Sequence, residues 1–146
     1  MEINLTDTGK RYNREWIFRH VDYRFTPGNS YAIIGPNGSG KSTLLQVIAG
    51  AIMHTEGKID YNINNAAVAA GASYKHIAFS APYLELIEEM TATELLRFHA
   101  SFKTLTASIP AMLEAVALPQ AAHKQIRYFS SGMKQRLKLA QAFFTD

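Results

Sequence analysis

Hydrophobic side chains recur at every second position in two stretches of the first half of the chain. Val21, Tyr23 and Phe25 alternate with polar residues, and a similar alternation runs from Glu56 to Ile63. Successive side chains of a strand point to opposite faces of a sheet. This period therefore predicts half-buried strands over residues 21–26 and 56–63.

Two short apolar runs predict strands of another kind. Residues 30–35 read SYAIIG and follow a turn at Pro27-Gly28-Asn29, and residues 76–81 form a second run. Continuous apolar runs are typical of strands that are buried on both faces in a parallel sheet. We therefore expect an inner strand at residues 30–35 and a further strand at residues 76–81.

Apolar residues take up helical spacing in the rest of the chain. The first helical pattern begins at about Lys41, and Thr91 with Glu94 forms a capping box ahead of a second. Pro110 suits the first turn of a third helix, which is bounded by Pro119. The order of strand, glycine-rich turn and helix, followed by helices alone, predicts an α/β protein.

Composition narrows the classes of function. The chain has 146 residues, of which 47% are hydrophobic and 18% charged, and this suits one soluble domain. There is no cysteine and the five histidines are widely spaced, so neither a disulfide framework nor a zinc site is expected. The net charge of +3 is scattered, so no nucleic-acid partner is expected. No run approaches the roughly 18 apolar residues of a membrane span, which predicts a cytoplasmic protein.

A phosphate-binding loop is predicted between the apolar run at 30–35 and the helix that follows it. The stretch fits G-x-x-x-x-G-K-[ST], and its glycines would let backbone N–H groups approach phosphate at a helix N-terminus. We expect Lys41 to contact the β and γ phosphates, the Ser42 hydroxyl to bind Mg²⁺, and Thr43 to offer a further donor. The alternative is a plain strand-to-helix connection, which would require neither the lysine nor the hydroxyl. The candidate nucleotide-binding residues are Gly35, Pro36, Asn37, Gly38, Ser39, Gly40, Lys41, Ser42 and Thr43.

This loop and a second motif together resemble the ATP-binding cassette (ABC) ATPases. The second motif is similar to the family signature L-S-G-G-Q-x-Q-R and reads Phe129-Ser130-Ser131-Gly132-Met133-Lys134-Gln135-Arg136. The resemblance implies an α/β P-loop NTPase fold of ABC type, with an N-terminal antiparallel β subdomain, a partial parallel core sheet and a helical subdomain. It covers the whole chain as one incomplete domain. Residues 1–82 would form the β subdomain and P-loop core, 83–130 the helical subdomain and 130–146 the signature helix.

The signature turn is expected to act across a dimer. In the family, this turn of one copy contacts the γ-phosphate held by the loop of another copy. The resemblance implies that Ser130 donates its hydroxyl and Gly132 its backbone N–H, beside Ser131 and Met133, which replace glycine and glutamine. Ser130 is also an ordinary helix N-cap, and the two roles are compatible. The helix that follows should have a solvated basic face with Lys134 and Lys138 and an apolar face of Met133, Leu137, Ala140 and Phe144.

An aromatic ring in the N-terminal sheet is expected to stack on adenine. Family members carry this ring a little under thirty residues before the loop lysine, and Tyr12 lies at that distance from Lys41. Stacking adds affinity with little selectivity among bases. The alternatives are that Tyr12 is a surface or packing residue and that Trp16 supplies the ring.

Two features depart from the family pattern. The usual glutamine after the strand predicted at 76–81 is replaced by Pro82, which has no donor, so that Ser80 or Tyr83 would have to substitute through water. The apolar strand ending in Asp-Glu (Walker B) and the later histidine, which serve hydrolysis in the family, do not occur in the 146 residues. The acids of residues 84–89 precede the helical subdomain and are expected to be solvated. The resemblance therefore implies a piece of a longer cassette.

The resemblance implies the ATP-binding subunit of an ABC transporter. This subunit would bind MgATP, pair with a second copy or a related ATP-binding subunit, and power an integral membrane permease from the inner face of the cell membrane. Lys41 is the catalytic residue present, and hydrolysis would belong to the full-length protein. The alternatives are a non-transport ABC ATPase, a nucleotide-dependent interaction module without hydrolysis, and a phosphate-loop kinase or GTPase, for which the second motif would be coincidental.

Overall fold

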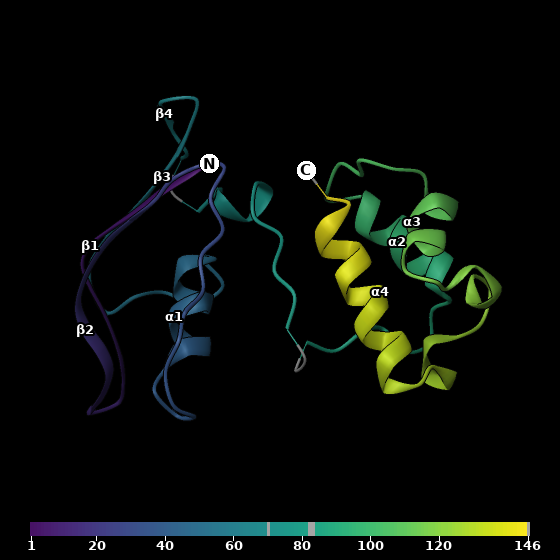
Figure 1. The fold of residues 1–146 in the computed structure, drawn as a ribbon, viewed down its shortest axis with the longest axis horizontal. Helices are drawn as coiled ribbons and strands as arrows, with labels where there is room; N and C mark the ends of the chain where they lie inside the picture. The colour runs from purple at the N-terminus through teal and green to yellow at the C-terminus, as the bar shows by residue number, and fades with distance from the viewer. Residues whose placement is uncertain (70, 82–83, 146) are drawn as a thin grey trace. The chain divides into compact units, whose positions relative to one another are not determined.

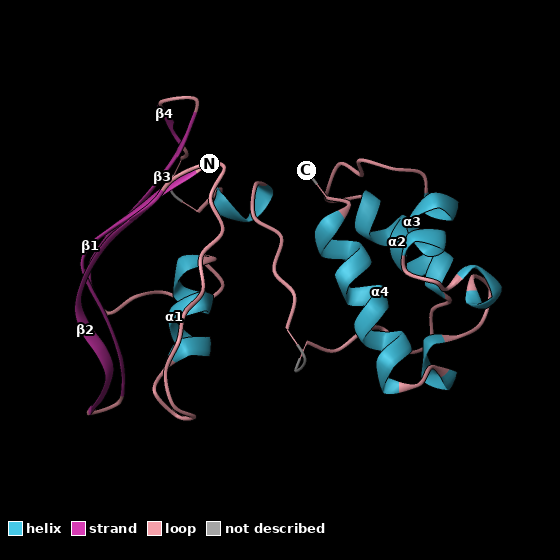
Figure 2. Cartoon of the chain, viewed as in Figure 1, coloured by secondary structure: helices cyan, strands magenta, loops and turns pink. Residues whose placement is uncertain are grey.

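The computed structural model describes residues 1–69, 71–81 and 84–145, and it divides into two compact units of residues 1–76 and 77–146 (Figure 1). The first unit carries the strands and helix α1, and the second carries three α-helices (Figure 2). The α/β class, the antiparallel N-terminal sheet and the helical region predicted from the sequence are confirmed.

An antiparallel sheet with the strand order β2-β1-β3-β4 forms the framework of the first unit. The strands predicted at 21–26 and 56–63 are confirmed, and β2 begins before the alternating pattern does. The strands are β1 (Glu2–Tyr12), β2 (Glu15–Phe25), β3 (Glu56–Ile63) and β4 (Ala66–Ala67).

Helix α1 (Lys41–Ile48) is anchored by its C-terminal half. Val47 and Ile48 are buried, and the Tyr61 hydroxyl of β3 donates to the Ile48 carbonyl at 3.1 Å. Leu5 and Thr8 of β1 are buried in the same unit. The C-terminal end of α1 is therefore fixed to the sheet, and its N-terminal end carries the predicted loop.

The strands predicted at residues 30–35 and 76–81 were wrong. Residues 30–35 and 76–81 lie outside every strand, and Ile34 is 91% exposed. The strands of the described residues pair only with one another and only antiparallel, so the implied parallel core sheet is not formed in this part of the chain. An apolar run becomes an inner strand only where neighbours satisfy its backbone groups on both sides. Pro82 and Tyr83 lie outside the described residues.

The second unit packs α2 (Ala92–Ala100), α3 (Ile109–Ala115) and α4 (Ser131–Phe143) around an apolar core. The predicted capping box and the proline in the first turn of α3 are confirmed. Short 3₁₀ turns connect the helices. The fully or nearly buried core side chains are Ala92, Leu95, Leu96, Met112, Leu113, Leu118, Ala121, Ile126, Phe129, Leu137 and Ala140.

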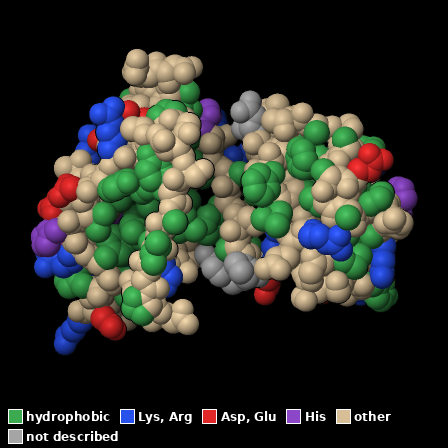
Figure 3. Space-filling view, in the orientation of Figure 1, with side chains coloured by type: hydrophobic (Ala, Val, Ile, Leu, Met, Phe, Trp, Pro, Cys, Tyr) green, Lys and Arg blue, Asp and Glu red, His purple; other side chains and the backbone are tan. Residues whose placement is uncertain are grey.

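Helix α4 shows the predicted apolar face. Leu137 and Ala140 are buried, and Met133 and Phe144 pack against the same core. In the view of Figure 3, Lys and Arg side chains lie at several places on the surface of each unit. Within the described ranges, no helix has both the length and the apolar character needed to cross a bilayer.

Candidate functional site

The predicted phosphate loop depends on glycine at two positions. Gly38 and Gly40 have φ angles of 82° and 85°, in the left-handed region that favours glycine. The Ser39 N–H donates to the Pro36 carbonyl at 3.3 Å and closes a turn between them. Gly40 is the N-cap of α1 and supplies no side-chain hydrogen bond, so the first amides of the helix are left for an external acceptor.

The Lys41 ammonium lies over this loop. Its Nζ donates to the carbonyls of Gly35 at 2.9 Å and Pro36 at 2.6 Å. Among the residues that the structure describes, the ion pairs do not include Lys41. The positive charge is therefore held at the loop by neutral carbonyl oxygens, which an anionic oxygen can replace with a stronger interaction.

Strand β2 packs directly against the loop. A Cβ added to Gly40 would lie 2.5 Å from Cγ2 of Ile17. The close approach fixes the β1–β2 hairpin beside the N-terminus of α1. Sequence reasoning missed Ile17, because no local pattern links a residue of the hairpin to a loop more than twenty positions later.

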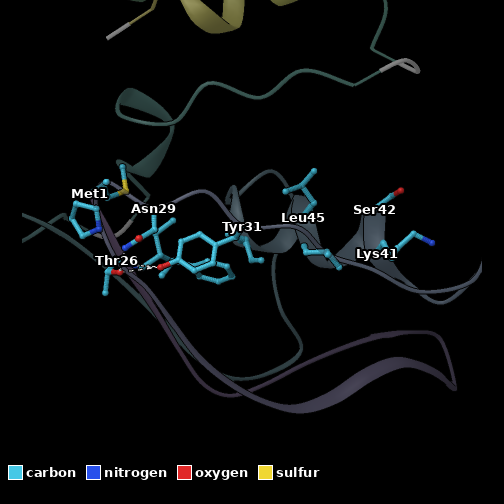
Figure 4. Close-up of a pocket in the computed structure, with 13 residues that line it drawn as sticks. Met1, Thr26, Asn29, Tyr31, Lys41, Ser42 and Leu45 are labelled. Carbon is cyan, nitrogen blue, oxygen red and sulfur yellow. Dashed lines mark hydrogen bonds between the residues drawn. The ribbon is translucent and has the colours of Figure 1, made fainter.

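A cavity of about 640 Å³ adjoins the helix that follows the loop. Figure 4 shows Lys41 and Ser42 at one end and Thr26 and Tyr31 farther along, with the Lys41 ammonium directed away from Tyr31. The Tyr31 hydroxyl contacts the backbone N–H and the hydroxyl of Thr26, both at 2.9 Å, and these bonds lower the pKa of Tyr31. Most of the remaining lining is apolar, so the loop, rather than this cavity, is suited to a triphosphate.

The two candidate rings for adenine differ in their surroundings. Tyr12 is 46% exposed, and the Lys10 ammonium lies 4.7 Å from the centre of its ring. Trp16 is less exposed and contacts the guanidinium groups of Arg11 and Arg19 at 5.1 and 4.1 Å. Tyr12 therefore offers the more accessible ring, with a cation already placed against it.

The signature turn belongs to the second unit and carries exposed donors. The Ser130 hydroxyl accepts from the Met133 N–H at 3.3 Å, which leaves its own proton available to donate outward. Ser131 and Gly132 are exposed in the first turn of α4, where backbone N–H groups have no intrahelical partner. Ser130 is therefore an N-cap, and its geometry also permits contact with an anion.

The predicted solvated basic face of α4 takes part in an ion pair. The Lys134 side chain is only 28% exposed and forms an ion pair with Glu88. This hydrogen bond lowers the pKa of the Glu88 carboxyl. Glu89 forms a second pair with Arg127 at 3.5 Å. The acids of residues 84–89 are exposed as predicted. The local sequence gave no signal for the two ion pairs, because each joins a glutamate to a cation nearly forty or more positions later.

Comparisons with known proteins agree on one family. A family model described as "ABC transporter" matches residues 18–146. An uncharacterized ABC transporter ATP-binding protein, YxlF of Bacillus subtilis, is 36% identical over 145 residues, which cover 96% of this chain and 48% of that protein. The chain thus spans about half the length of this curated relative.

Solved structures show the same similarity. An ATP-binding subunit of an ABC transporter superposes with a TM-score of 0.84 at 28% identity, over 99% of this chain and 62% of that one. A dimeric ATP-binding cassette in a post-hydrolysis state, bound to ADP and Pi, superposes with a TM-score of 0.80 at 24% identity, over 97% of this chain and 68% of that one.

Proposed function

Because this chain belongs to the ABC transporter family, we propose that it forms part of an ATP-binding subunit and holds MgATP in the loop of residues 35–43. One observation carries the proposal. The Lys41 ammonium is bonded to the carbonyls of Gly35 and Pro36, over a loop whose Gly38 and Gly40 adopt left-handed conformations.

Each part of the loop has a distinct task in this proposal. The backbone N–H groups of residues 37–43 surround the phosphates, and the N-terminus of α1 adds the positive end of its dipole. Lys41 exchanges its carbonyl acceptors for oxygens of the β and γ phosphates. Hydrogen bonds to charged groups contribute about 1.5–3 kcal/mol each, so the ammonium is a major part of the affinity.

Magnesium fits the oxygen donors of this loop. Ser42 lies in the first turn of α1 beside Lys41, and the described residues contain no cluster of three acids or histidines that could hold a metal ion by itself. Mg²⁺ commonly takes one or two protein ligands together with phosphate oxygens. Ser42 would hold the ion, which neutralises phosphate charge when it is bound, and Thr43 would add a donor.

We further propose that Tyr12 stacks on adenine and that the signature turn meets ATP bound to another copy or to a paired ATP-binding subunit. The exposed Ser130 hydroxyl and Gly132 N–H support this pairing, and one solved structural neighbour is a dimer. In the full-length protein, ATP hydrolysis would then drive an integral membrane permease from the cytoplasmic face. The name of the Bacillus subtilis relative, an ABC transporter ATP-binding protein, supports this role.

A nucleotide-dependent module without hydrolysis is the second candidate. Proline at position 82 favours it, because proline has no polar side chain with which to replace the amide of the family's glutamine. Phosphate release by the full-length protein decides between the two. An ATPase releases phosphate from MgATP and loses this activity in Lys41→Ala, whereas a binding module retains MgATP and releases none.

ATP binding itself is tested by calorimetric titration of the protein and of Lys41→Ala. We expect the variant to lose ATP binding because the loop no longer holds a cation. Lys75→Ala is the matched control, since Lys75 is an exposed lysine of the same unit. Equal ATP affinity in Lys41→Ala and Lys75→Ala would refute the assignment.

A further inference from the structure

Residues 88–91, which precede α2, are hydrogen-bonded to residues 125–127, which lead into the signature turn. The Ile126 N–H donates to the Met90 carbonyl at 2.9 Å, and the Arg127 N–H donates to the Glu88 carbonyl at 3.0 Å. A β-bridge joins Thr91 to Gln125. These contacts place the Glu88 side chain within reach of α4.

The Glu88 carboxylate continues this connection into the signature helix. It accepts a hydrogen bond from Lys134 in the first turn of α4, where the Lys134 side chain is 28% exposed and that of Glu88 is 50% exposed. A cation near a helix N-terminus interacts unfavourably with the helix dipole, and an adjacent anion offsets this effect. Glu88 supplies that anion.

Glu88 is not the only acid in this region, which provides a matched comparison. Its neighbour Glu89 contacts Arg127 at 3.5 Å through a more exposed side chain. Glu88 therefore contacts α4 itself, whereas Glu89 contacts a residue ahead of the turn. Removing either carboxylate changes the net charge by the same amount, but only the Glu88 carboxylate contacts α4.

We propose that Glu88 is a positioning residue for the signature turn. By holding Lys134, it fixes the first turn of α4, so that the Ser130 hydroxyl and the Gly132 N–H are directed outward toward the phosphate of a second copy. This inference rests on the proposed function, which brings an ATP phosphate to that turn.

A positioning role and a simple charge effect predict opposite changes in ATP-dependent association for Glu88→Gln. Loss of a negative charge beside an anion-binding turn would strengthen ATP-dependent association if charge alone mattered. Loss of the ion pair should weaken it if Glu88 positions the turn. Glu89→Gln removes the same charge and breaks a pair with Arg127, but it leaves the contact between Glu88 and α4 in place.

The association test uses sedimentation of the full-length protein with and without ATP. We expect Glu88→Gln to weaken ATP-dependent association about 2- to 5-fold, the range of a partly exposed ion pair, and Glu89→Gln to leave it unchanged or strengthened. Lys134→Met should weaken association less in the Glu88→Gln background than in the wild type, because the pair is already broken there. Equal effects of the two glutamine variants, or independent effects of Glu88→Gln and Lys134→Met, would overturn the assignment.

Hydrogen exchange separates this inference from the proposed pairing. The Met133 N–H donates to the Ser130 hydroxyl and the Lys134 N–H to the Ser130 carbonyl, so both amides report on the first turn. Glu88→Gln should speed their exchange by about 2- to 5-fold without ATP, and Glu89→Gln should not. If the wild type fails to associate with ATP, the proposed pairing fails while this exchange still decides the role of Glu88. Unchanged exchange in Glu88→Gln would refute that role.

Discussion

The contact between the hairpin and the phosphate loop predicts a large cost for Gly40→Ala. Two effects combine at this position. Its φ of 85° costs an L-residue about 1–2 kcal/mol. The new methyl group would lie 2.5 Å from Cγ2 of Ile17, and overpacking typically costs about 1–3 kcal/mol. Together these effects predict a loss of about 2–5 kcal/mol in the free energy of unfolding.

Two matched variants separate the effects. Gly38 has almost the same φ, but a Cβ there meets no atom within 4 Å, so Gly38→Ala should cost only the conformational strain of about 1–2 kcal/mol. In the double variant Ile17→Ala/Gly40→Ala the atom that clashes is absent. The combined cost should then be smaller than the sum of the single costs.

Urea unfolding followed by tryptophan fluorescence measures these differences. Trp16 is the only tryptophan of the chain and lies in β2, so the signal reports on the first unit. The midpoint should fall furthest for Gly40→Ala. Equal midpoints for Gly38→Ala and Gly40→Ala, or full additivity with Ile17→Ala, would refute the contact between the hairpin and the loop.

Further predictions concern the ring, a helix cap and acid. Tyr12→Ala should cost about 1–3 kcal/mol of ATP binding but leave tripolyphosphate binding unchanged, and equal losses for both ligands in calorimetry would contradict stacking. Thr91→Ala removes the N-cap of α2 and should lower the free energy of unfolding of the second unit by about 1 kcal/mol, whereas an unchanged midpoint of urea unfolding followed by far-UV circular dichroism would show that the cap is dispensable. The protein should also lose stability as the pH falls below the unfolded carboxyl pKa of 4.5, because folding lowers the pKa of several glutamates and their contribution disappears as they are protonated. These glutamates are Glu2, Glu56, Glu88 and Glu94. Thermal unfolding between pH 6 and pH 3 measures this loss, and a constant midpoint temperature would contradict it.

Features set by neighbouring residues could be predicted from the sequence. The left-handed glycines of the loop, the capping box at Thr91 and the N-cap at Ser130 each depend on a few consecutive residues. The apolar face of α4 follows from a helical period that packing preserves. Local chemistry was sufficient for these elements.

Features that depend on distant partners could not be predicted. The apolar run at 30–35 has the composition of an inner strand, but strand formation requires backbone partners, which an alternating or apolar pattern does not specify. The contacts of Ile17 with Gly40 and of Glu88 with Lys134 join residues more than twenty positions apart. Only the three-dimensional structure reveals these pairs.

The central claim is that the loop of residues 35–43 encloses the phosphates of ATP. The most direct test follows the amide resonances of Gly38, Gly40 and Lys41 by NMR during titration with MgATP and with tripolyphosphate. We predict that both ligands shift these resonances together and saturably, because the phosphates accept hydrogen bonds from the loop. If neither ligand moves these resonances while ATP shifts amides elsewhere in the chain, the claim is contradicted.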